Sequence, residues 1–184
     1  MLSRILDFAR ELLAEAIPAG GTAIDATAGN GHDTLFLTSC TGPAGKVYSF
    51  DIQEQALHNT AARLKEAGAA AELIQDSHEN AASYIKEAAI DAAVFNLGYL
   101  PGSDKTITTT SSSTIQAIKS LLEKLRPGGR IVIVVYYGHP EGMQEKDALL
   151  PFAASLPQEE VKVLRYEFIN QRNSPPFVLA VEKR

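Results

Sequence analysis

Apolar and polar residues alternate along this sequence in the way expected of strands separated by helices. Five short segments rich in apolar and β-branched residues are predicted to be strands: 22–27, 46–52, 71–75, 90–97 and 130–137. Helices are expected over 1–18, from the glycine-rich stretch after 27 to about Cys40, over 53–68, over 77–88, up to Pro127, and over about 144–155. This alternation predicts right-handed crossovers and a parallel sheet with helices on both faces, in which 130–137 is the central strand.

The end of the chain departs from this alternation. Segments 160–170 and 177–183 are both extended, and the short link around Ser174-Pro175-Pro176 leaves no room for a crossover helix. The two segments are therefore expected to form an antiparallel hairpin. An α/β fold with a mostly parallel, seven-stranded sheet that ends in such a hairpin resembles the Rossmann-like fold of class I methyltransferases, which depend on S-adenosylmethionine. Because repeats and a long linker are missing, residues 1–184 are expected to form a single domain, with helix 1–18 packed on the sheet.

Composition and charge narrow the classes of function. Hydrophobic residues make up 45% of the chain and charged residues 21%, as in globular domains. The 17 Lys and Arg against 22 Asp and Glu give a net charge of -5, so nucleic acid would have to bind to a local basic patch. A single cysteine excludes a disulfide framework. With neither a secretory signal nor an apolar run long enough to cross a bilayer, a cytoplasmic protein without membrane contact is expected.

A glycine-rich stretch follows the first predicted strand, where a doubly wound sheet presents its ligands. Gly29 and Gly31 would let the backbone approach a ligand closely, but Thr34 stands where a dinucleotide fingerprint needs a third glycine. An acidic residue at the strand end followed by G-x-G resembles the first motif of S-adenosylmethionine-dependent methyltransferases. The expected cofactor residues of this stretch are Asp25, Ala28, Gly29, Asn30, Gly31, Asp33 and Thr34.

Two further strand ends carry polar residues that suit an adenosine. Asp51 ends the second strand, where a carboxylate can accept hydrogen bonds from both ribose hydroxyls, although NAD enzymes use the same contact. The third strand ends in a segment that resembles the site where methyltransferases meet the adenine amino group. The expected cofactor contacts here are Asp51, Gln53, Asp76, Ser77 and His78, together with Asn96 of the fourth strand. The alternative is that the aspartates only cap helices and the glycines only shape a turn.

The fourth strand ends in Asn96-Leu97-Gly98-Tyr99-Leu100-Pro101-Gly102, which resembles the Asn/Asp-Pro-Pro-Tyr motif of methyltransferases that act on nitrogen. Leu97 and Gly98 replace the two prolines of that motif. An Asn side-chain oxygen and the next backbone carbonyl can accept the hydrogens of an amine and aim its lone pair at a methyl group. Asn96 and Tyr99 are therefore candidate catalytic residues. Otherwise Asn96 is a turn residue, and Tyr99 and Pro101 pack a loop.

Histidine and cysteine chemistry adds one more candidate. His139 follows the fifth strand and is expected to face the substrate across the pocket from Asn96, where it could accept or relay a proton of the amine. The alternative is that His139 orders a turn rich in Gly and Pro. Cys40 is expected to lie away from the strand ends, which argues against a cysteine nucleophile. No two histidines have metal-ligand spacing, so no metal is predicted.

Four stretches together are similar to one short bacterial family. They are residues 25–34, Asn-Leu-Gly-Tyr-Leu-Pro-Gly at 96–102, Gly-His-Pro-Glu-Gly at 138–142 and Asn-Gln-Arg-Asn-Ser-Pro-Pro at 170–176. The family was first labelled as rRNA methylases, and its members convert 5-aminomethyl-2-thiouridine at wobble position 34 of tRNA to the 5-methylaminomethyl form. The resemblance covers nearly the whole chain. It implies S-adenosylmethionine as cofactor, the tRNA anticodon arm as partner and N-methylation of an exocyclic primary amine, which agrees with the Asn-led motif.

Binding of tRNA by an acidic protein requires local positive charge. Lys105, together with Arg165, Arg172 and Lys183-Arg184 of the hairpin, could form a basic patch beside the pocket. Tyr99, Tyr136 and Tyr137 could stack on unpaired bases. Substrate or RNA contacts are expected at Leu97, Gly98, Pro101, Lys105, Tyr137, Arg172 and Asn173. The alternative for each basic residue is that it is simply solvated.

Two other functions fit part of the sequence. An rRNA or small-molecule amine methyltransferase of the same fold is the first, and the lack of an added RNA-binding domain favours a small-molecule substrate. A nucleotide-binding module or NAD-dependent dehydrogenase is the second, but the incomplete glycine fingerprint argues against it. The protein is expected to be a monomer or a homodimer.

Overall fold

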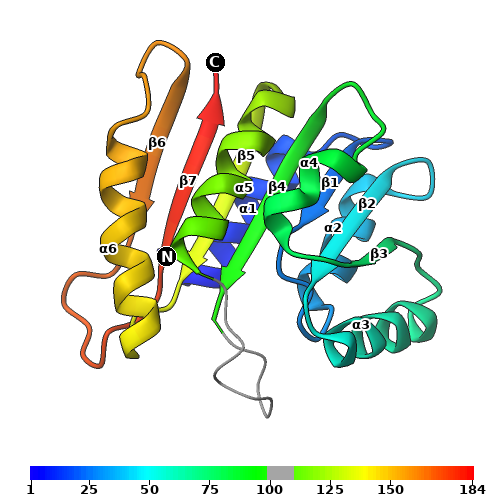
Figure 1. The fold of residues 1–184 in the computed structure, drawn as a ribbon, viewed down its shortest axis with the longest axis horizontal. Coiled ribbons are helices and arrows are strands. Elements are labelled where there is room, and N and C mark those ends of the chain that lie inside the picture. Colours follow the sequence, from blue (N-terminus) through cyan, green and yellow to red (C-terminus); the bar gives the residue numbers. More distant parts are fainter. Residues whose placement is uncertain (99–109) are drawn as a thin grey trace.

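Strands and helices alternate in the predicted order in the computed structural model, which describes residues 1–98 and 110–184 (Figure 1). The strands are β1 (Thr22–Asp25), β2 (Lys46–Asp51), β3 (Glu72–Gln75), β4 (Ile90–Leu97), β5 (Leu125–Val135), β6 (Val161–Tyr166) and β7 (Phe177–Lys183). The helices are α1 (Ile5–Ala16), α2 (His32–Thr41), α3 (Glu54–Glu66), α4 (Ala81–Tyr84), α5 (Ser111–Lys124) and α6 (Pro140–Ala154), with a 3₁₀ turn η1 (His78–Asn80). The predicted strand 90–97 is confirmed residue for residue.

The strands form one seven-stranded sheet in the order β3-β2-β1-β4-β5-β7-β6. Strands β1 to β5 are parallel to one another, whereas β7 is antiparallel to both β5 and β6. The predicted class of fold, including the C-terminal antiparallel hairpin, is therefore confirmed. Because β1 lies between β2 and β4, the strand order reverses at β1, and doubly wound sheets bind their ligands at such a switch point.

Each face of the sheet has its own apolar core, because successive strand residues point to opposite faces. On one face, Leu13 of α1 packs in a cluster with Val132 of β5. On the other face, Leu121 of α5 packs in a cluster with Ile133 of β5. In Figure 1, α5 and α6 lie in front of the sheet, and α1 and α2 lie behind it. Burial on both faces explains why β5 contains the most apolar run of the sequence.

Three predictions about single elements are wrong. Only η1 and the one-turn helix α4 form within 77–88, because Ile85 has an extended backbone (ψ 115°) and is buried in the core. Helix α6 begins at Pro140 instead of near 144, since the His139 side chain caps it and proline suits the first helical turn. The central strand is β4, not β5, because β7 and β6 extend the sheet beyond β5.

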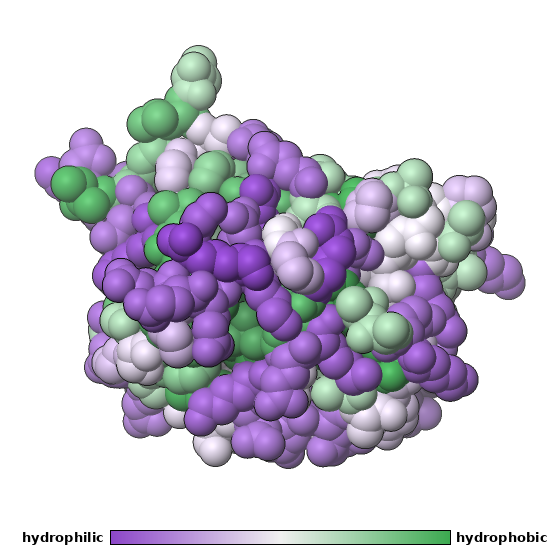
Figure 2. Space-filling view, turned by 90° about the horizontal axis from the view of Figure 1, so that it is seen from above, coloured by the Kyte–Doolittle hydropathy of each residue, from purple (hydrophilic) through white to green (hydrophobic). Residues whose placement is uncertain are grey.

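The amino ends of the parallel strands form the edge of the sheet opposite the site described below. Figure 2 looks onto this edge and shows mostly hydrophilic residues with smaller apolar areas between them. Within the two described ranges, no helix combines the length and the apolar character that a membrane span requires.

Candidate active site

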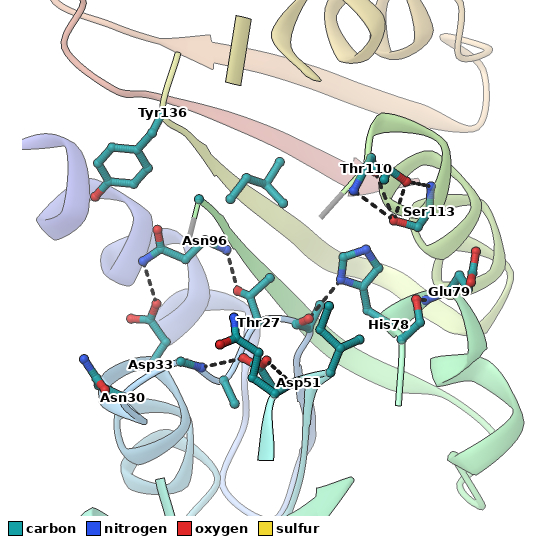
Figure 3. Close-up of a pocket in the computed structure, with 18 of the residues that line it drawn as sticks. Thr27, Asn30, Asp33, Asp51, His78, Glu79, Asn96, Thr110, Ser113 and Tyr136 are labelled. Atoms are coloured by element: carbon teal, nitrogen blue, oxygen red, sulfur yellow. Dashed lines mark hydrogen bonds between the residues drawn. The ribbon is translucent and has the colours of Figure 1, made fainter. Parts of the chain in front are cut away.

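A cavity of about 700 Å³ opens at the carboxyl edge of the parallel strands, at the switch point between β1 and β4 (Figure 3). Its lining comprises Ala26, Thr27, Ala28, Gly29, Asn30, His32, Asp33, Asp51, Ile52, Gln53, Asp76, Ser77, His78, Glu79, Asn96, Leu97, Gly98, Thr110, Ser113, Tyr136 and His139. Most of the predicted cofactor residues therefore lie together around one cavity. Asp25, Gly31 and Thr34 are not part of this lining.

The glycine loop between β1 and α2 is held by residues of α3 that the sequence motifs did not indicate. Arg63 donates from Nε to the Asn30 carbonyl oxygen at 2.7 Å, and Asn59 donates to the Asn30 side-chain oxygen at 2.9 Å. Gly31 has φ 78°, and a Cβ added there would lie 2.8 Å from the Cα of Thr60. Helix α3 therefore fixes the shape of the loop, and Gly31 is required by close packing as well as by its conformation.

Asp51 connects the end of β2 to the glycine loop. One carboxylate oxygen accepts the Gly29 backbone N–H at 3.0 Å, and the other accepts the Gln53 backbone N–H at 2.9 Å. Each carboxylate oxygen can accept more than one hydrogen bond, so both retain the capacity to bind a ligand. This geometry suits the two hydroxyl groups of a ribose.

Asp25 lies fully buried beneath the loop. Its carboxylate accepts hydrogen bonds from the Thr34 hydroxyl at 2.7 Å and from the Thr27 backbone N–H at 3.0 Å. Burial raises the pKa of Asp25 to about 7, and the negative charge of Asp33 contributes in the same direction, whereas the two hydrogen bonds lower it. Asp25 therefore supports the loop from below.

His78 and Asp76 lie at the β3 end of the cavity. His78 Nδ1 is 3.0 Å from the Ala26 carbonyl oxygen, and burial lowers the pKa of this histidine, so the neutral ring donates from Nδ1. His78 Nε2 is buried and has no hydrogen-bond partner within the described part of the chain. An acceptor without a partner in the cavity wall suits a ligand N–H such as an amino group. Asp76 accepts hydrogen bonds from Tyr84 and Asn80, and these contacts lower its pKa.

Asn96 is held at two points at the end of β4. Its backbone N–H donates to Oγ1 of Thr27 at 2.8 Å, and its side-chain Nδ2 donates to Oδ2 of Asp33 at 3.1 Å. Figure 3 shows the Asn96 side-chain oxygen pointing away from Asp33, on the side of Tyr136. Burial raises the pKa of Tyr136, and the charge of Asp33 adds to this effect. Asn96 therefore presents an oriented acceptor in the wall of the cavity.

His139 lines the cavity and caps α6. Its Nδ1 accepts the Gly142 backbone N–H at 3.1 Å. The same Nδ1 lies 3.3 Å from Oε2 of Glu141. These contacts show that His139 caps α6 and orders the turn, and a role for His139 in proton transfer stays a prediction.

The predicted RNA-binding residues are distributed more widely than expected. Arg172 and Asn173 are exposed in the segment between β6 and β7, and Asn173 has φ 64°, which is uncommon for a residue other than glycine. Tyr137 lines a second hollow of about 320 Å³, which shares His139 with the main cavity. Tyr99, Pro101 and Lys105 lie outside the described residues.

Part of the predicted basic patch does not lie beside the cavity. Lys183 lies at the opposite edge of the sheet, because β7 runs antiparallel to β5, and its Nζ donates to the Leu122 carbonyl at 2.9 Å. The prediction that Lys183 and Arg184 flank the pocket is therefore wrong. Arg165 is paired with Glu167 and lies 4.6 Å from the ring centre of Phe177.

Similar proteins of known structure share the whole fold. The chain is 39% identical to a "putative rRNA-methylase" from Clostridium thermocellum, with a TM-score of 0.97 over 100% of both chains. It is 42% identical to a "putative methyltransferase" from Streptococcus mutans that was solved in complex with SAH, with a TM-score of 0.91 over 100% of both chains.

A plant protein is also similar in sequence. The chloroplastic tRNA (mnm(5)s(2)U34)-methyltransferase of Arabidopsis thaliana is 35% identical over 180 residues, which are 92% of this chain and 66% of that protein. The chain thus spans just under two thirds of this relative's length. This plant relative and the solved structures confirm the expectation that the chain is an S-adenosylmethionine-dependent methyltransferase. Residues 47–182 match the family described as "Putative rRNA methylase", and the chain belongs to this family.

Proposed function

We propose that the protein transfers a methyl group from S-adenosylmethionine to the 5-aminomethyl group of uridine or 2-thiouridine at wobble position 34 of tRNA. The observation that carries this proposal is the position of Asn96, which offers an oriented acceptor in the same cavity as the ribose-binding geometry of Asp51. The name of the Arabidopsis relative supports tRNA as the substrate class.

The lining residues fit the cofactor at both ends. Asp51 would accept the ribose hydroxyls. His78, which lines the same cavity and whose Nε2 has no partner among the described residues, would accept a hydrogen of the adenine amino group. The glycine loop would lie against the methionine portion, because its backbone closes the cavity between β1 and α2. When bound, S-adenosylmethionine supplies an electrophilic methyl group on a sulfonium.

The protein's part in the chemical step is mainly one of orientation. Asn96 would accept hydrogens of the neutral amine and direct its lone pair to the methyl carbon. The N–C bond forms while the C–S bond breaks, and the electron pair of that bond stays on sulfur. The new secondary ammonium then releases a proton to water. A protein nucleophile is not needed, and Cys40 on α2 is not part of the cavity lining.

The tRNA would approach the mouth of the cavity from the hairpin side. Arg172 and Asn173 are exposed there, and Tyr137 lies in the adjoining hollow. Cationic side chains can contact phosphates, and tyrosine rings can stack on unpaired bases. A flipped wobble nucleotide would bring the amine to Asn96.

Methylation of a small-molecule amine is the second candidate. The net charge of -5 favours it, as does the engagement of Arg10, Arg63 and Arg165 in contacts within the protein. Of these three arginines, only Arg165 belonged to the predicted basic patch.

The test uses the purified protein, S-adenosylmethionine and tRNA that carries 5-aminomethyl-2-thiouridine. Mass spectrometry of the digested nucleosides should reveal conversion to the 5-methylaminomethyl form. Matched tRNA with unmodified wobble uridine should stay unchanged. Methylation of free aminomethyl-uridine, with the tRNA left unmethylated, would support the small-molecule function instead.

A further inference from the structure

A series of polar contacts runs from the first helix to Asn96. Arg10 of α1 lies with Nη2 3.6 Å from Oδ1 of Asp33, and Oδ2 of Asp33 accepts the Asn96 side-chain amide at 3.1 Å. Asp33 and Asn96 line the cavity, whereas Arg10 does not. We infer that Asp33 and Arg10 are positioning residues, which hold Asn96 so that its oxygen faces the substrate amine. This inference rests on the proposed role of Asn96.

The carboxylate of Asp33 determines which way the Asn96 amide turns. An ionised carboxylate can only accept hydrogen bonds, so the amide nitrogen must face Asp33 and the oxygen must face away. The Asn96 backbone is held independently by the Thr27 hydroxyl at 2.8 Å. With the main chain and the nitrogen both fixed, the oxygen is directed to the Tyr136 side of the cavity (Figure 3). A fixed acceptor loses less entropy when it meets the amine.

Two sources of positive potential lie next to the Asp33 carboxylate. Asp33 lies in the first turn of α2, where the positive end of the helix dipole favours an anion. Because the Asp33 side chain is only 18% exposed, solvent only partly screens its ion pair with Arg10. The Arg10 guanidinium in turn lies 5.4 Å from the ring centre of Phe36, a contact that restricts its position.

A negative charge next to the amide nitrogen also changes the acceptor strength of the oxygen. Hydrogen bonds in a series polarise one another, so donation to Asp33 makes the Asn96 oxygen a stronger acceptor. Orientation and polarisation act in the same direction. Both would affect the methyl-transfer step more than cofactor binding.

The experiment measures kcat and KM for tRNA methylation and, separately, the calorimetric Kd for S-adenosylmethionine. Asp33→Ala should lower kcat by roughly 10- to 100-fold and Arg10→Ala by about 3- to 10-fold, because small misplacements of reacting groups are costly. The Kd should change by less than about threefold in both variants, since the affected interaction acts on the chemical step. Arg10→Lys should recover most of the loss because it keeps the charge.

Arg4→Ala is the matched control. Arg4 precedes the same helix and also forms an ion pair with an aspartate, Asp7, but this pair is exposed and neither residue lines the cavity. This variant should match the parent in kcat, Kd and thermal stability. Asp33→Asn provides a second variant of nearly the same shape, whose amide can donate to the Asn96 oxygen and so no longer fixes its direction.

A double-variant comparison separates positioning from cofactor binding. If Asp33 acts through Asn96, adding Asp33→Ala to Asn96→Ala should lower kcat by less than about twofold further. If the two losses in kcat multiply, Asp33 acts independently of Asn96 and the inference is overturned. A Kd that rises while kcat is kept would also overturn it and would make Asp33 a cofactor ligand. Parental kcat in the Asp33 and Arg10 variants, with Asn96→Ala impaired, would overturn this inference alone. Parental kcat in Asn96→Ala would overturn the proposed role of Asn96 as well.

Discussion

Asp51 accepts the Gly29 backbone N–H at 3.0 Å, which joins the carboxylate at the end of β2 to the glycine loop that follows β1. The two parts of the proposed cofactor site are therefore not independent. A change at Asp51 removes a candidate ligand contact and also releases a backbone N–H of the loop.

Asp51→Ala should weaken binding of S-adenosylmethionine severely. Loss of charge-assisted hydrogen bonds to the ribose should cost roughly 1.5–3 kcal/mol, which corresponds to a Kd about 10- to 150-fold higher. Calorimetric titration measures this change. Asp51→Asn, which keeps one acceptor oxygen, should have an intermediate Kd, and thermal unfolding should report a folded protein in both cases. An unchanged Kd in the alanine variant would refute the ribose assignment.

Asn96→Ala should separate binding from chemistry. The Kd for S-adenosylmethionine should stay close to the parental value, whereas the single-turnover rate should fall by roughly 100-fold or more, because Asn96 orients the amine. Rapid mixing of saturated enzyme with aminomethyl-uridine tRNA gives the rate. If that rate equals the parental one, Asn96 does not accept the amine hydrogens.

The hairpin and the segment after β4 should hold the RNA. Replacing both Arg172 and Lys105 by Ala should weaken tRNA binding and flatten its salt dependence by about two phosphate contacts, without changing the cofactor Kd. Affinity measured across a salt series gives the slope. Lys183→Ala is the matched control, because it removes a cation from the opposite edge of the sheet. Identical lines for parent and double variant would exclude this surface as the RNA site.

Asp25 should make the stability of the fold depend on pH. Its folded pKa of about 7 lies above the ordinary value of 3.8, so between these values the folded state holds a proton that the unfolded state has released. The stabilisation is fully present below the unfolded pKa. It is lost as the pH rises through 7, at up to about 1.4 kcal/mol per pH unit.

Asp25→Asn removes this titration. The free energy of unfolding of both proteins is measured with denaturant at a series of pH values. As the pH rises to about 7, the value for the parent should fall relative to that for the variant. His78 has a lowered pKa and acts in the opposite sense, but it is present in both proteins and its effect cancels. A constant difference between the two proteins at every pH would contradict the assignment.

Gly31→Ala should destabilise the protein more than Gly68→Ala. Both glycines have positive φ, 78° and 63°, but only at Gly31 would the new Cβ meet a neighbour, the Cα of Thr60 at 2.8 Å. Backbone strain alone costs about 1–3 kcal/mol, and the clash at Gly31 adds to it. Denaturant unfolding of both variants measures the difference. Equal losses would mean that α3 yields to the added atom.

The fold could be predicted from the sequence because each element carries a local signal. The segment 90–97 is mostly apolar and is followed by Gly98, and β4 spans the same residues. The helix predicted over 77–88 failed because burial of Ile85 in the core outweighed the helical pattern. Tertiary packing of this kind leaves no periodicity that a sequence could reveal.

The candidate site was predictable where residues occupy strand ends and unpredictable where helices reach across to them. Asp51 and Asn96 follow from the rule that parallel strands meet at one edge. Arg10 and Arg63 come from the faces of α1 and α3, and only the packing of these helices brings them to Asp33 and Asn30. Lys183 was predicted at the wrong edge of the sheet. Because β7 runs antiparallel to β5, its carboxyl end lies at the edge opposite the cavity.

The order of strands in the sheet also governs how the protein is assembled during synthesis. The strand β6 is made before β7, yet β7 lies between β6 and β5, so β6 has no partner in the sheet until its successor has left the ribosome. The strands β1 to β5, whose ends surround the cavity, are complete earlier. A nascent chain that stalls after β6 would expose the unpaired edge of β5, which is prone to aggregation. This edge of β5 is covered only when β7, the last strand to be made, takes its place in the sheet.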